Sequence, residues 1–104
     1  MGRPLARVGP LAISAIRLWA IAWLVKHGRI ETTLAVDAFV KRCASYVEVL
    51  PITEAIAVRS VEFPAPYPAD PQDRLIGASA VVEGRPLLTQ DRLIVKSRLV
   101  PLAG

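Results

Sequence analysis

Three aspartates in the last third of the chain are the residues best suited to chemistry. Asp70 and Asp73 frame the run Asp-Pro-Gln-Asp, and Asp91 follows Pro-Leu-Leu-Thr-Gln at 86–90. Ligands of open parallel sheets lie beyond the carboxyl ends of the strands, so a buried strand at 86–89 would bring Asp73 and Asp91 to one crevice. Two carboxylates there would suit Mg²⁺ or Mn²⁺. Helix capping and ordinary surface exposure also explain both acids.

The composition indicates one folded domain. With 104 residues we expect a single domain over 1–104, in which a basic, poorly ordered segment at 1–10 precedes a core at 11–104. Hydrophobic residues make up 53% and charged residues 21%, a balance typical of a compact soluble fold. Cys43 is the only cysteine, which excludes an internal disulfide and fits a reducing, cytoplasmic location.

Positive charge gathers near the start of the chain. The first 29 residues hold five of the 13 lysines and arginines and no acid, whereas the rest is nearly neutral. Such an end could contact RNA, an acidic partner or a membrane surface, or it could simply be solvated. Basic residues before the apolar stretch 11–25 also fit a secretion signal, but Arg17 interrupts that stretch and it is shorter than the roughly 20 residues of a membrane span.

Strand and helix patterns alternate along the chain. This order favours an α/β fold with a mainly parallel sheet. Capping residues mark the predicted helix starts, namely Ser14, Thr32 or Thr33, Thr53 and Asp70, and Gly28 and Gly84 mark helix ends. The predicted strands are 11–13, 46–50, 86–89 and an edge strand at 99–102, and the predicted helices are 14–27, 32–45, 53–62, 70–83 and 91–97.

Apolar spacing predicts which helical side chains are buried. The helix at 14–27 is apolar around most of its circumference, so Trp19 and Trp23 are expected in a core or against a partner. Cys43 falls in the apolar stripe of the next helix and is expected to be a core residue. His27, in the last turn before Gly28, is expected to interact with free helix carbonyls.

Two segments of the chain point to a family. Asp-Pro-Gln-Asp-Arg-Leu-Ile-Gly-Ala-Ser-Ala at 70–80, followed by Pro-Leu-Leu-Thr-Gln-Asp at 86–91, resembles the PIN-domain ribonucleases, in particular the VapC toxins of type II toxin–antitoxin systems. The segments at 13–22, 26–30 and 99–101 are similar to the family in the same order. The resemblance implies a PIN-like α/β/α sandwich with a mainly parallel sheet.

The resemblance also implies an activity and its residues. PIN-domain toxins are Mg²⁺- or Mn²⁺-dependent endoribonucleases in which a metal-bound water attacks an RNA phosphodiester, and a cognate antitoxin neutralises them. On this chain the resemblance makes Asp73 and Asp91 the catalytic acids and metal ligands, Asp70 a further metal ligand at the pocket edge, and Thr89 a supporting hydroxyl. Arg74 is expected to pair with a neighbouring acid.

Two departures from the family pattern lead us to expect impaired activity. No hydrophobic strand ending in an aspartate precedes Leu11, so the fold is expected to lack the usual first strand. The family glutamate after the tryptophan is Ala20 here, and Arg17 replaces a small hydroxyl residue. With two of four acids missing, metal binding should be weak.

Two other interpretations stay open at this point. The chain could be a catalytically inactive PIN-like binding module that engages an antitoxin or a second protomer through its apolar surface. A secreted or membrane-anchored small protein is the third interpretation, although we expect no membrane partner.

Overall fold

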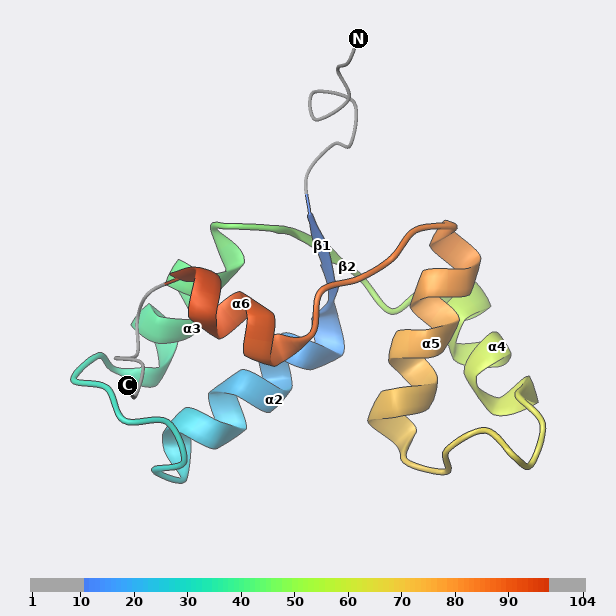
Figure 1. Cartoon of the computed structure of the whole chain (residues 1–104), viewed down its shortest axis with the longest axis horizontal. Helices are drawn as coiled ribbons and strands as arrows, with labels where there is room; N and C mark the ends of the chain where they lie inside the picture. The colour runs from blue at the N-terminus through green and yellow to red at the C-terminus, as the bar shows by residue number, and fades with distance from the viewer. Residues whose placement is uncertain (1–10, 98–104) are drawn as a thin grey trace, which may run out of the picture.

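Two short strands and five helices make up the described part of the chain in a computed structural model (Figure 1). The described residues are 11–97, apart from the side chain of Asp91. The predicted segment at 1–10 and the predicted edge strand at 99–102 lie outside them. The strands are β1 (Ala12–Ser14) and β2 (Glu48–Leu50), and the helices are α2 (Ala15–Lys26), α3 (Val36–Ala44), α4 (Glu54–Glu62), α5 (Pro71–Glu83) and α6 (Gln90–Ser97).

The two strands pair in parallel, with Ala12 opposite Glu48 and Ser14 opposite Leu50. The chain between them passes through α2 and α3, the crossover that a parallel pair requires. This arrangement confirms the predicted α/β class, although the sheet is smaller than expected. In Figure 1 the strands lie between two groups of helices, with α2, α3 and α6 on one side and α4 and α5 on the other.

The predicted strand at 86–89 is not formed. Its Leu88 N–H donates to the Ala12 carbonyl at 2.8 Å, so the segment does run beside β1. Two of its residues are unsuited to a ladder. Pro86 has no N–H, and the Thr89 carbonyl accepts from Leu93 N–H at 3.1 Å in the first turn of α6. The Thr89 hydroxyl also caps α6 by accepting from Arg92 N–H at 3.2 Å. Too few residues remain to pair as a strand.

Most helix starts follow the predicted capping residues. The Ser14 hydroxyl accepts from Ile16 N–H and the Thr53 hydroxyl from Ile56 N–H, each at 3.3 Å. Asp70 Oδ2 accepts from Asp73 N–H at 3.1 Å at the start of α5. These bonds satisfy helix N–H groups that have no partner within their own helix. The predicted starts of α2, α4 and α5 are therefore confirmed.

Helix α3 begins later than predicted. Its N-cap is Ala35, which offers no side-chain cap, rather than Thr32 or Thr33. The Thr32 hydroxyl instead accepts from Leu34 N–H at 3.1 Å and closes a local turn. A threonine that bonds its own neighbours in this way competes with helix formation, so the helix starts only after the turn.

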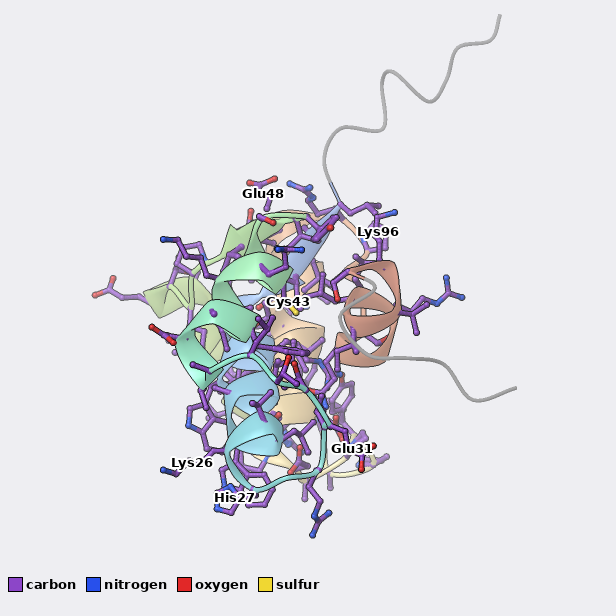
Figure 2. All side chains as sticks on the ribbon, turned by 90° about the vertical axis from the view of Figure 1, so that its left-hand side faces the viewer. Lys26, His27, Glu31, Cys43, Glu48 and Lys96 are labelled. Carbon is purple, nitrogen blue, oxygen red and sulfur yellow. The ribbon has the colours of Figure 1, made fainter. Side chains whose placement is uncertain are left out.

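The main core lies between β1, α2, α3 and α6. It is built from five fully buried side chains, which are Ile13, Ile21, Phe39, Cys43 and Leu93. Cys43 is thus a core residue, as predicted, and its sulfur lies inside the ribbon in Figure 2 while Lys26 and His27 lie at the outer end of α2. Burial raises the pKa of the Cys43 thiol, and a hydrogen bond with the Ser97 side chain lowers it in part.

Helices α4 and α5 form a separate packed pair. Ile56 of α4 and Ala78 of α5 are fully buried in it. Arg74 joins the two helices by donating to three backbone carbonyls, those of Ser60, Phe63 and Tyr67, at 3.2 to 3.3 Å. The predicted pairing of Arg74 with an acid is wrong, because the carbonyls at the end of α4 have no helical partner and accept from its guanidinium.

The two tryptophans of α2 are not in the core. Trp19 is 55% exposed and Trp23 is 40% exposed, so the first of the two predicted placements, in the core, is wrong, and the second, against a partner, stays a prediction. Helix α2 is apolar on nearly every side, but its neighbours bury only the face that carries Ala20 and Ile21. No helix within residues 11–97 has the length and apolar character needed to cross a bilayer.

Candidate functional site

A pocket of about 320 Å³ opens where α2 faces the first turns of α5 and α6. Arg17, Ala20 and Leu24 reach it together because residues three and four apart share one face of a helix. Gln72 is the second residue of α5, and Gln90 is the first residue of α6. The described lining comprises Arg17, Trp19, Ala20, Trp23 and Leu24 from α2 with Gln72 and Gln90.

Arg17 is the charged group among these described lining residues. One of its terminal nitrogens, Nη1, donates to Gln90 Oε1 at 3.4 Å, a long hydrogen bond. Its Nε–H is buried and has no hydrogen-bond partner among residues 11–97. A buried donor without a partner has lost water and gained no bond in return, at a cost of about 1–3 kcal/mol. The pocket therefore holds an unused hydrogen-bond donor on a cation.

Two aromatic side chains of α2 line the pocket. The ring of Trp23 stacks on His27, with centroids 3.9 Å apart, and His27 Nδ1 lies 2.9 Å from the Trp23 carbonyl. That contact confirms the predicted interaction of His27 with a helix carbonyl. Trp19, the more exposed of the two tryptophans, adds an apolar surface beside Arg17.

Two of the predicted acids do not line the pocket. The side chains of Asp70 and Asp73 are exposed at the start of α5, and neither belongs to the lining, although Gln72 between them does. Asp91 follows Gln90 at the start of α6, and its side chain lies outside the description. The structure thus brings the starts of α5 and α6 to one pocket, while a shared crevice for Asp73 and Asp91 stays a prediction.

Thr89 caps helix α6 at the edge of this arrangement. It is exposed and caps α6, as described above, so its hydroxyl is already accepting a hydrogen bond. The hydroxyl can still donate to a second group. Its predicted role beside the acids stays a prediction.

The described lining does not fit a divalent metal ion. Across residues 11–97, no three histidine, cysteine, aspartate or glutamate side chains with described positions gather closely enough to hold one. Ala20 contributes only a methyl group, and the guanidinium of Arg17 repels a cation. Mg²⁺ needs several well-placed oxygens, and the two glutamine amides offer only neutral ones.

Sequence reasoning missed Gln72 and Gln90 as pocket residues. The available signal was their position, since each directly precedes a singled-out acid, Gln72 in the first turn of the helix predicted at 70–83 and Gln90 immediately before the helix predicted at 91–97. A larger hollow of about 1010 Å³ lies between the end of α2 and the loop before α3. Its ionic residues are Lys26, Glu31 and Arg42, and it carries none of the predicted site residues.

Comparisons with known proteins agree with the predicted resemblance. Residues 3–96 match the PIN domain family. The chain is 36% identical over 88 residues to Ribonuclease VapC22 of Mycobacterium tuberculosis, a match that covers 85% of this chain and 68% of the relative. No solved structure matches the chain. Together with its parallel strands and flanking helices, these matches establish that the chain belongs to the PIN-domain family, as a VapC-type ribonuclease relative.

Proposed function

We propose that this chain is a VapC-type PIN-domain protein whose metal-dependent RNA cleavage is impaired, and whose partners are RNA and a cognate antitoxin. The observation that carries the proposal is the lining of the pocket at the starts of α5 and α6. There Arg17 and Ala20 stand where the family resemblance calls for a small hydroxyl residue and a glutamate. One carboxylate is exchanged for a methyl group, and a cation is added beside it.

Both exchanges oppose a bound Mg²⁺ or Mn²⁺. The ion gives up part of its hydration only when several oxygens replace the lost waters, and each missing carboxylate removes a negative charge that offsets this cost. We assign any cleavage that remains to Asp73 and Asp91, with Asp70 at the edge of the site and Thr89 in support. The expected cofactor stays Mg²⁺ or Mn²⁺, bound weakly.

The alternative proposal is an inactive binding module that engages an antitoxin or a second protomer. It is favoured by the exposure of Trp19 and Trp23, which leaves large apolar rings on the outside of α2. Exposed aromatic side chains of this kind are enriched where proteins bind partners. The two proposals differ in one property, which is whether the folded chain cleaves RNA at all.

The test is cleavage of a structured RNA pool by the purified chain in Mn²⁺, with EDTA and Asp91→Asn as controls. We expect slow cleavage that both controls abolish. Glu83→Gln is the matched control, because Glu83 is an exposed acid at the far end of α5. No cleavage by demonstrably folded protein would favour the binding module.

A variant that restores the family pattern tests the cause of the impairment. The double variant Arg17→Ser with Ala20→Glu returns a hydroxyl and a carboxylate to the pocket, and we expect cleavage to rise at least tenfold. Arg59→Ser with Ala57→Glu changes the net charge equally on exposed positions of α4 and should leave the rate unchanged. If the cleavage rate rises equally in both double variants, or rises in neither, the proposed cause is contradicted.

A further inference from the structure

We propose that the pocket formed by α2, α5 and α6 binds the phosphate group of a nucleotide through Arg17, without a metal ion. The inference deepens the proposed function, because it concerns the same pocket. It assigns that pocket a ligand that the metal-dependent reaction does not require. Its test is a binding measurement in EDTA, so it stands or falls separately from cleavage.

The first argument is the state of the Arg17 side chain. Its Nε–H is buried without a partner, and its contact with Gln90 Oε1 is long at 3.4 Å. A guanidinium donates through Nε and one terminal nitrogen in a fork that matches two oxygens of a phosphate. An oxyanion in the pocket would satisfy the orphaned donor, which no other described group does.

The second argument is the surrounding charge. Among the described side chains that line the pocket, Arg17 is ionic and none is acidic. The first turn of α6 adds the positive end of a helix dipole, whereas at α5 the exposed Asp70 and Asp73 offset that contribution at the rim. Asp91, next to Gln90, adds a further negative charge near the start of α6. The described lining therefore offers an anion one positive side chain and no negative one.

The third argument is what surrounds the cation. Trp19 and Trp23 offer apolar ring surface, and Gln72 and Gln90 carry amides that both donate and accept hydrogen bonds. Proteins that hold single nucleotides or single strands combine a cation for the phosphate with aromatic rings on which a base stacks. A volume of about 320 Å³ suits a ligand of that size. A nucleotide matches this lining better than a bare anion does.

The experiment follows the Nε–Hε signal of Arg17 by ¹⁵N–¹H NMR of the full chain in EDTA. The probes are inorganic phosphate, uridine 5′-monophosphate and uridine. We expect both phosphate-bearing probes to shift the Arg17 signal and uridine to leave it in place. Uridine 5′-monophosphate should bind more tightly than phosphate, since its base can stack.

Variants assign the binding to the pocket. Arg17→Met should weaken binding of uridine 5′-monophosphate at least tenfold, and Arg17→Lys, which keeps the charge but lacks the Nε donor, should weaken it less. Arg59→Met removes an exposed arginine of α4 and should change nothing. Trp19→Ala should weaken the binding of uridine 5′-monophosphate and leave the binding of inorganic phosphate unchanged.

Three results would overturn the proposal. The first is equal binding by wild type and by a folded Arg17→Met or Arg17→Lys variant, and the second is binding that appears only when Mg²⁺ is added. The third is an equal shift with acetate, which would make the site a carboxylate site instead. A short oligouridylate separates the two sources of the ligand: tighter binding than the mononucleotide indicates a nucleic-acid strand, and equal binding indicates a free nucleotide.

Discussion

Arg74 and Arg17 occupy two regions of the molecule and are used in opposite ways. Arg74 lies between α4 and α5, where it donates to three backbone carbonyls and lies 5.7 Å from the centre of the Tyr67 ring. Arg17 lies on the pocket side of α2, with a single long hydrogen bond and a buried Nε–H that has no described partner. The guanidinium of Arg74 thus has several hydrogen-bond acceptors within the chain, whereas that of Arg17 keeps a donor without one.

The difference separates a structural arginine from one that is available to a ligand. Arg74 makes its contacts entirely within the chain. It donates to carbonyls at the C-terminal end of α4 and in the loop that leads into α5. Arg17 carries the cost of burial without the corresponding bonds. The comparison predicts that the two arginines differ in their effects on stability.

Replacing Arg74 should have the largest effect. Arg74→Met keeps the apolar stem and removes all three hydrogen bonds to carbonyls, together with the contact over Tyr67. We expect a loss of about 2–4 kcal/mol in the free energy of unfolding, because bonds from a charged donor are the stronger kind. Urea unfolding followed by circular dichroism measures it. Arg59→Met on the exposed side of α4 is the control, and an equal loss in both variants would contradict a structural role.

Crowding at Gly77 should have the next largest effect. Gly77 lies in the middle of α5, and a Cβ added there would stand 2.9 Å from Tyr67 Cζ. Tyr67 is held by its stack on Phe63, with centroids 4.2 Å apart, so it cannot easily move aside. Gly77→Ala should therefore destabilise the chain by about 1–2 kcal/mol, although alanine is the better helix former.

The double variant Gly77→Ala with Tyr67→Ala tests whether the Tyr67 ring causes this loss of stability. Relative to Tyr67→Ala alone, the added alanine should no longer destabilise, because the ring it meets is gone. A thermal melt of the four proteins in this cycle gives the coupling between the two positions. Independent, additive effects would show that the ring does yield.

Arg17 should matter least of these three positions for stability. Arg17→Met removes an unpaired buried donor and keeps an apolar stem, so we expect the free energy of unfolding to change by less than about 1 kcal/mol, or to rise. Urea unfolding under the conditions used for Arg74→Met gives a direct comparison. A loss as large as that of Arg74→Met would place Arg17 among the structural residues.

The sequence predicts local structure well where short-range chemistry decides it. Ser14, Thr53 and Asp70 were identified as caps because a cap depends on side-chain oxygens within three residues. The failures arise where distant contacts decide. The apolar character of α2 predicts Trp19 and Trp23 in a core or against a partner, but which neighbours cover a helix decides between the two, and helical spacing alone does not encode that.

The site shows the same division. The starts of α5 and α6 were recognised from Asp70, Asp73 and Asp91, and the structure brings these starts to one pocket with α2. The pairing of Arg74 with an acid was wrong, because the carbonyls it contacts belong to residues up to 14 positions away and have no signature in the sequence. The unpaired Nε–H of Arg17 likewise emerges only from packing.

The smallest expected effect concerns the core that lies behind α2. Burial raises the pKa of the Cys43 thiol above its ordinary value of 9.0, despite the hydrogen bond with Ser97. The unfolded chain then releases the thiol proton at lower pH than the folded chain, so the contribution of Cys43 to stability is full below pH 9.0 and is lost as pH rises through the folded pKa. Urea midpoints of wild type and Cys43→Ala are compared at neutral pH and above pH 9, which isolates this thiol from other titrating groups. The midpoint of wild type should fall relative to that of Cys43→Ala at the higher pH.

Iodoacetamide should label the thiol of the native chain far more slowly than that of the unfolded chain. The reactive form is the thiolate, and in the native chain the thiol is buried. Equal labelling rates would mean that the core opens as freely as the pocket beside Arg17, and the contrast between a closed core and an open site would be lost.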